Sequence, residues 1–180
     1  MSIHCYVGTP DHANPHVVHA RFVRRDGQPT AVVPTLARIW AGRARRDAHA
    51  LAAAVLAYDW EYLDDTITAT ACTLSGQHPV PGVGMPVGAP AACGAVVDAS
   101  EPVSVFPLCR AGDLDTPWVY LIDPATSTVT VHTDDGEALA RYRLDTCAIP
   151  HPLPPLPSGN ALGRSGRARG VSTSPAGTAR

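Results

Sequence analysis

The chain has 180 residues, of which 45% are hydrophobic and 17% are charged. A chain of this length can bury roughly two thirds of its unfolded surface without disulfides or a metal, which excludes a stapled mini-protein. Eighteen Pro and 15 Gly argue against an all-helical bundle or a long coiled coil. All 16 acidic residues but only ten of the 14 Arg lie in the first 150 residues, so this part repels nucleic-acid phosphates. The absence of Lys and the abundance of Ala are typical of a GC-rich bacterial genome.

The cysteines indicate a reducing compartment. They are odd in number and widely separated, and none forms a C-x-x-C pair. This pattern favours reduced, mostly buried thiols over a disulfide framework. The N-terminal residues have neither the positive run nor the apolar run of a signal peptide, and no segment approaches the roughly 18 apolar residues that span a bilayer. We therefore expect a cytoplasmic protein that does not enter a membrane.

The first predicted element is a hairpin. Residues 16–25 predict a strand, residues 26–27 (Asp-Gly) are a strong turn signal, and residues 30–33 predict the returning strand. Pro34 interrupts that strand. Residues 35–40 are too few to distinguish a helical turn from a continued edge strand.

The main helix is predicted over residues 43–63. Leu51, Val55 and Tyr58 recur at steps of four and three residues along one stripe, and the alanines of the opposite face favour a helix. Trp60 lies at the border of the stripe. We therefore expect its indole ring to be partly exposed and available to a partner.

The second half of the chain predicts mainly strands. Residues 66–74 are rich in Thr and predict a strand, whereas the prolines of residues 77–94 predict an extended loop. A short strand over residues 103–106 precedes a three-stranded meander. Its strands are expected over the apolar run 118–122, which we place centrally in the sheet, around Val129 and Val131, and over residues 138–144, with turns at residues 123–126 and 134–136.

These elements predict a single globular α+β domain over residues 1–149. Its mostly antiparallel sheet combines the N-terminal hairpin with the C-terminal three-stranded meander and packs on one main helix. Residues 150–157 are rich in Pro and predict a linker, although their P-x-x-P spacing also fits a ligand for aromatic-lined grooves. Residues 158–180 predict a disordered Arg/Gly/Ser tail that contacts nucleic acid only weakly.

The main binding candidate is the acidic and aromatic end of the predicted helix, which comprises Asp59, Trp60, Glu61, Asp64 and Asp65. Acids at a helix C-terminus lie at the negative end of the helix dipole, so another charge should compensate them. Solvent together with an internal arginine, such as Arg141 or Arg143, would suffice. A divalent cation or a basic protein partner would also suffice, and we predict the partner.

A metal site is the alternative. Half of the eight histidines fall within sixteen residues, namely His4, His12, His16 and His19. On a strand His16 and His19 would point to opposite faces, but residues 14–15 (Asn-Pro) could turn the chain so that His12 and His16 converge. Together with Asp11 they would hold one divalent metal ion in a metal-dependent hydrolase.

Two further motifs predict no activity. Cys93 and Cys109 are candidate nucleophiles, but no spacing pairs either with a histidine base, and no G-x-S-x-G elbow is present. The glycines of residues 82–88 lack the following helix that a phosphate loop needs, since Pro86 and Pro90 block it. We therefore expect a small cytoplasmic interaction or regulatory module without catalytic activity and without a cofactor.

Overall fold

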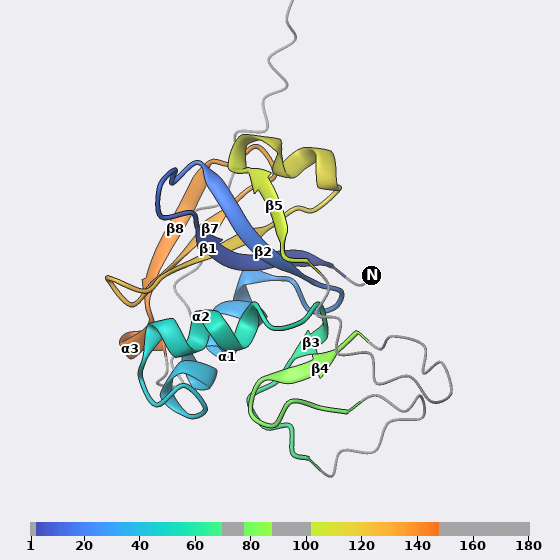
Figure 1. Ribbon diagram of the computed structural model, residues 1–180, viewed down its shortest axis with the longest axis vertical. Helices are drawn as coiled ribbons and strands as arrows, with labels where there is room; N and C mark the ends of the chain where they lie inside the picture. The colour runs from blue at the N-terminus through green and yellow to red at the C-terminus, as the bar shows by residue number, and fades with distance from the viewer. Residues whose placement is uncertain (1–2, 70–77, 88–101, 148–180) are drawn as a thin grey trace, which may run out of the picture.

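The computed structural model describes residues 3–69, 78–87 and 102–147. They form one eight-stranded sheet with two helices, α1 and α2, packed against it (Figure 1). In chain order the elements are β1 (Cys5–Pro10), β2 (Val17–Val23), α1 (Pro29–Ala41), α2 (Ala48–Val55), β3 (Trp60–Leu63), β4 (Gly84–Pro86), β5 (Ser104–Pro107), the 3₁₀ helix η1 (Leu108–Leu114), β6 (Val119–Asp123), β7 (Thr128–His132), β8 (Ala138–Arg143) and α3 (Leu144–Cys147).

The sheet is mixed, with the strand order β4-β3-β2-β1-β6-β7-β8 and with β5 also paired to β2. β1 pairs antiparallel with β2 and parallel with β6, while β2 pairs parallel with β3. The segment that contains α1 and α2 supplies the crossover that a parallel β2–β3 connection requires. The predicted sheet, mostly antiparallel and packed on one main helix, is therefore wrong, because the parallel pairs join strands that no local pattern relates.

The predicted hairpin after β2 is also wrong, because residues 30–33 lie in α1. Asp26 has a positive φ of 58° and turns the chain, but the turn leads into a helix. Pro29 occupies the first helical position, where its missing N–H costs nothing. α1 continues through Pro34, and the burial of side chains such as Leu36 offsets the cost of an interior proline, about 3 kcal/mol. The true hairpin partner of β2 is β1, a strand that our sequence analysis missed.

The helix predicted over residues 43–63 is much shorter. α2 begins after Asp47, whose carboxylate accepts hydrogen bonds from the N–H groups of His49 and Ala50 at 2.8 and 3.2 Å. The helix ends at Val55, and residues 60–63 form β3. Trp and Tyr favour strands, and their spacing in this segment fits a strand as well as a helix.

The predicted meander is confirmed. β6, β7 and β8 pair antiparallel in succession, and β6 lies between β1 and β7 in the interior of the sheet. Val129 and Val131 are fully buried, as predicted. Gly136 adopts a φ of 84° in the second turn. The short strand predicted over residues 103–106 is β5.

The remaining predictions concern segments that are only partly described. Within the predicted loop 77–94, residues 84–86 form β4 and pair with β3, so that part of the prediction is wrong. Of the strand predicted over residues 66–74, the described part contains no strand. The linker and the tail, residues 150–180, lie outside the described residues. Among the described residues, no helix combines the length and the apolar composition that crossing a bilayer requires.

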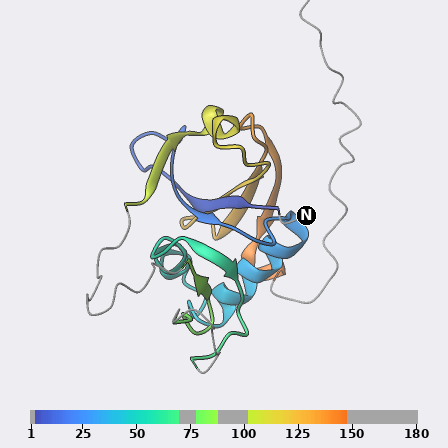
Figure 2. The ribbon, with the colours of Figure 1, turned by 90° about the vertical axis from the view of Figure 1, so that its right-hand side faces the viewer.

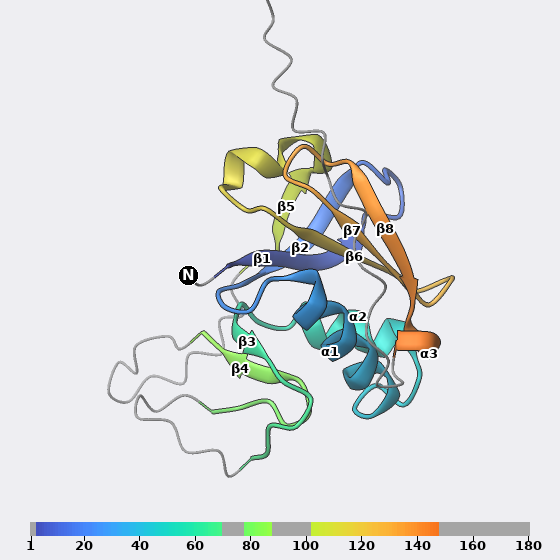
Figure 3. The same cartoon turned by 180° about the vertical axis from the view of Figure 1, so that it is seen from behind.

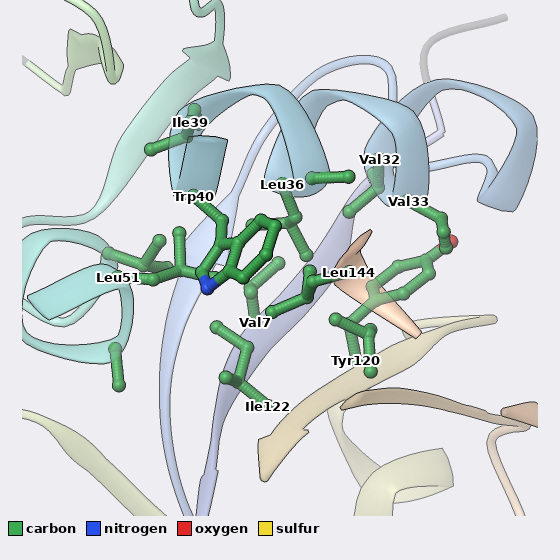
Figure 4. Packing of buried hydrophobic residues seen from close by; sticks show 14 of the residues in the cluster. Val7, Val32, Val33, Leu36, Ile39, Trp40, Leu51, Tyr120, Ile122 and Leu144 are labelled. Atoms are coloured by element: carbon green, nitrogen blue, oxygen red, sulfur yellow. The ribbon is translucent and has the colours of Figure 1, made fainter. Parts of the chain in front are cut away.

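The core has two parts, one on each face of the sheet. Between the sheet and the helices, Val7 and Ile122 pack with Leu36 of α1 and Leu51 of α2 (Figure 4). The sheet curves strongly around its other face (Figure 2). There the second cluster consists of Val18, Ala20, Phe106, Ala111, Val119 and Leu121, from β2, β5, β6 and η1.

Gly8 allows β1 and β2 to approach closely. It lies opposite Ala20 in the hairpin and beside Leu121 of β6. A Cβ atom on Gly8 would lie 2.6 Å from the Ala20 Cα and 2.7 Å from its Cβ, and it would overlap the His19 carbonyl oxygen. Glycine is therefore required at this position of the hairpin.

Candidate functional site

Trp60, the aromatic centre of the predicted contact surface, is fully buried. Its side chain lies on β3 at 0% exposure, and its Nε1 donates a hydrogen bond to the Val55 carbonyl at 2.7 Å. The prediction that the Trp60 indole is partly exposed is therefore wrong, because residues 60–63 form a strand on which Trp60 faces the core. Tyr58 is the exposed aromatic residue instead, at 47% exposure, and its ring packs edge-on against Trp60.

The four acids of this segment all have partners within the protein. Their carboxylates accept hydrogen bonds or form ion pairs, namely Asp59 with the Phe22 N–H at 2.9 Å, Glu61 with Arg24 and Arg25, Asp64 with the Thr66 N–H at 2.8 Å, and Asp65 with Arg38 at 2.8 Å. The compensating arginines are thus Arg21, Arg24, Arg25 and Arg38, not Arg141 or Arg143. A basic partner at this surface would have to displace them.

Asp59 fills a gap along the outer edge of β2. β5 pairs with β2 only from Val17 to Ala20, and β3 meets it only at Val23. Between these two neighbours the Asp59 carboxylate accepts the hydrogen bond of the Phe22 N–H that a neighbouring strand would otherwise accept. This hydrogen bond explains why position 59 is acidic, and the explanation requires no binding partner.

Beneath this gap lies a buried arginine, Arg21. Its Nε donates to the Leu56 carbonyl at 2.9 Å, just after α2, and its Nη1 donates to the Pro102 carbonyl at 3.3 Å. Nη1 also lies 3.9 Å from Asp59. These contacts bind the end of α2 to the sheet, so the charge of Arg21 serves the fold.

The predicted metal ligands do not converge. The Asp11 carboxylate accepts hydrogen bonds from the N–H groups of residues 13 and 14 and lies 3.0 Å from the His19 Nε2. The N–H of residue 14, then the His19 ring, hold the pKa of Asp11 below its ordinary value. His12 and His16 are exposed, and His19 is the histidine that meets Asp11. In residues 3–69, 78–87 and 102–147, no three His, Cys, Asp or Glu side chains are grouped to hold a metal.

The other predicted motifs have structural positions. Cys93 lies outside the described residues, and Cys109 is exposed on η1. Gly82 and Gly84 adopt positive φ values of 71° and 159° in the turn that leads into β4. The conformation of Gly82 thus belongs to a turn that leads into a strand.

A pocket of about 400 Å³ lies where β1 begins and β2 ends, and His4, Phe22, Arg24 and Arg25 line it. Antiparallel pairing brings them together, since Cys5 lies opposite Val23 in the hairpin. This end of β1 lies beside the N-terminus marked in Figure 1. We refer to it as the arginine pocket.

The two arginines of the arginine pocket share one carboxylate. Arg25 Nη2 lies 2.8 Å from one carboxylate oxygen of Glu61, and Arg24 Nη1 lies 3.4 Å from the other. Glu61 is only 13% exposed, whereas the two arginine side chains are 59% and 63% exposed. One carboxylate therefore bridges two guanidinium groups. The His4 Nε2 donates to the Asp115 carbonyl at 2.5 Å, which orients the His4 ring at the pocket wall.

A row of rings leads away from the arginine pocket across the curved face of the sheet. The ring centroids of His4 and Phe22 are 5.4 Å apart, those of Phe22 and Tyr6 are 5.5 Å apart, and those of Tyr6 and Phe106 are 5.3 Å apart. Burial, followed by the charge of Asp59, raises the pKa of Tyr6. The row packs Phe22 between two rings, so it holds the pocket wall in place.

Sequence patterns do not predict this pocket. The signal for it is the Arg24-Arg25 pair at the end of a predicted strand, but its meaning depends on β1, which brings His4 beside that pair. Glu61 comes from β3, a segment predicted as helix. The chain matches no protein-family model, no curated protein and no solved structure.

Proposed function

We propose that this protein is a small cytoplasmic binding module whose arginine pocket holds an anionic ligand. The proposal rests on one observation, the convergence of Arg24 and Arg25 on the single carboxylate of Glu61. Guanidinium groups match the paired oxygens of carboxylate and phosphate, and Glu61 shows that one such group can contact both arginines. A volume of about 400 Å³ lies in the range of small-molecule sites, roughly 300–1,000 Å³.

The proposal keeps the class that the sequence predicts, an interaction or regulatory module without catalytic activity, but reverses the charge of the ligand. A basic partner at Asp59, Glu61, Asp64 and Asp65 would compete with arginines and with backbone N–H groups. An anion in the arginine pocket would compete with the Glu61 carboxylate, which is itself mostly buried. Among the described residues, Cys5 is a free thiol at 0% exposure, which supports the cytoplasmic location that the cysteine pattern predicts.

Titration of the full chain with inorganic phosphate at low ionic strength tests the proposal. Arg25→Gln is expected to weaken binding about tenfold or more, because a hydrogen bond to a charged group contributes roughly 1.5–3 kcal/mol. Glu61→Gln is expected to strengthen binding, because it removes the internal competitor. Isothermal titration calorimetry or NMR shifts measure both changes.

Arg110→Gln is the matched control. Arg110 is an exposed arginine whose Nε forms one ion pair, with Asp113 at 2.7 Å, and it does not line the arginine pocket. Its loss removes the same charge from the protein. If Arg110→Gln and Arg25→Gln weaken phosphate binding equally, or if phosphate does not bind, the proposal is wrong.

A further inference from the structure

We infer that the ligand of the arginine pocket joins its anionic group to a planar ring. This inference rests on the proposed function and concerns the part of the ligand that lies away from the charge. Beside the two arginines, the residues that line the pocket are His4 and Phe22, and both carry rings. The arginines therefore select the charged group, and the rings select what is attached to it.

Both rings are held in place before a ligand arrives. The His4 ring is fixed by its hydrogen bond to the Asp115 carbonyl. Phe22 contacts His4 on one side and Tyr6 on the other, with centroid separations of 5.4 and 5.5 Å. Fixed side chains lose little conformational entropy on binding, so a planar partner gains most of the contact energy that it makes.

The arginine pocket has room for one small molecule. The arginines and the rings line the same volume of about 400 Å³, so a ligand that fills it contacts both. The Glu61 carboxylate, which spans Arg24 and Arg25, occupies the place where the anionic group of the ligand would bind. Aromatic carboxylates and nucleoside monophosphates share the required chemistry, an anion attached to a planar ring.

The test compares two pairs of probes on the full chain. 3-Phenylpropionate is compared with propionate, and adenosine monophosphate is compared with ribose 5-phosphate. In at least one pair the member with the ring is expected to bind about tenfold more tightly, as an aromatic contact predicts. The pair with the larger ratio identifies the source of the ligand, a carboxylic acid or a nucleotide.

Phe22→Leu removes the ring but keeps an apolar side chain. It is expected to abolish the preference for the probes with rings. Phe106→Leu is the matched control, because Phe106 stands at the other end of the same row and does not line the pocket. If Phe22→Leu does not fold, His4→Leu tests the second ring of the pocket in the same way.

The outcomes separate the two proposals. Equal affinity within both pairs, together with weaker binding of all four probes to Arg25→Gln, overturns the inference about the ring and leaves the anion site standing. A preference that survives Phe22→Leu but disappears in Phe106→Leu also overturns it. If none of the four probes binds, both the proposed function and the inference fall.

Discussion

Replacing Gly8 with alanine adds a single methyl group at the most crowded position of the β1–β2 hairpin. The new Cβ would lie 2.6 Å from the Ala20 Cα, whereas ordinary contact begins at 3.4 Å. The two strands would therefore have to separate by at least about 0.8 Å at this point, and by more to clear the His19 carbonyl oxygen, which lies closer still. Because β1 also pairs with β6 there, opposite Leu121, this separation strains two sets of backbone hydrogen bonds.

The expected cost of Gly8→Ala follows from these distances. Overpacking a core costs typically 1–3 kcal/mol, and more where backbone rather than a flexible side chain has to move. Alanine returns about 0.5–1 kcal/mol through the smaller entropy of its unfolded chain. We expect a net loss of about 2 kcal/mol from the free energy of unfolding. With a urea m-value of about 2 kcal/mol/M, the urea midpoint falls by about 1 M.

Gly42→Ala provides the control for this experiment. Gly42 follows α1 with a φ of −89°, and the nearest atom that its Cβ would meet is the Arg38 carbonyl oxygen at 3.3 Å. The chemical change is the same, but we expect a cost below about 1 kcal/mol. Urea unfolding followed by tryptophan fluorescence measures both variants. A Gly8→Ala midpoint within about 0.3 M of the wild-type value would refute the packing argument.

The two buried tryptophans offer a matched pair of variants. Trp60→Phe breaks an existing hydrogen bond and is expected to cost about 2–3 kcal/mol. Trp40→Phe is expected to lower the free energy of unfolding by at least about 1 kcal/mol less than Trp60→Phe does, because the Trp40 Nε1 is buried without a hydrogen-bond partner among the described residues. Equal losses of the two variants in urea unfolding would contradict this. Burial holds the pKa of His132 below its ordinary value, so the unfolded chain binds the proton more readily and stability falls as the pH decreases through about 6.5. His132→Asn should flatten this fall, and an unchanged slope would count against it. Burial raises the pKa of the Cys5 thiol, whereas Cys109 is exposed. Iodoacetamide should therefore label Cys109 in the folded protein and Cys5 only after unfolding, as peptide mass spectrometry would show.

Sequence patterns predict correctly those parts of the fold in which the contacting residues lie close together along the chain. In the meander, each strand pairs with the next one along the chain, and the turns between them contain Asp, Pro and Gly at characteristic places. The alternation of Val129 and Val131 then identifies the face of β7 that joins the hydrophobic core next to the helices. Local turn chemistry and a period of two are sufficient to define such a unit.

The errors arise where one pattern fits two structures. Tyr58 and Tyr62 are four residues apart, which fits a helix, but Trp60 and Tyr62 also fit a strand, and burial of Trp60 decides the outcome. Pro34 normally interrupts a helix, yet packing of α1 against the sheet outweighs its cost. Tertiary contacts decide both cases, and they are not visible in a window of ten residues.

The arginine pocket shows the same limit for a site. Arg24 and Arg25 end a predicted strand, but His4 reaches them only through the β1–β2 pairing and Glu61 only through β3. The aromatic row likewise joins strands that are distant in sequence, with Phe106 on β5. The residue types alone therefore indicate only that Arg24 and Arg25 are charged. The fold determines which side chains surround these charges and form the pocket with them.

The attachment of β3 has a consequence for amide hydrogen exchange. In the described part of the chain, the backbone of β3 meets β2 at a single residue pair, Val23 and Trp60, and the β3–β4 pair extends to one side of the sheet (Figure 3). Local opening of the β3–β4 pair leaves the hydrogen bonds between β1 and β2 intact. The amides of β3 and β4 should therefore exchange faster than those of β1 and β2. Glu61 lies on β3, and an anion that takes its place at Arg24 and Arg25 removes ion pairs that join β3 to the end of β2. Exchange of the β3 amides would therefore accelerate when the pocket is occupied, and a part of the sheet that binds nothing itself would report the presence of the ligand.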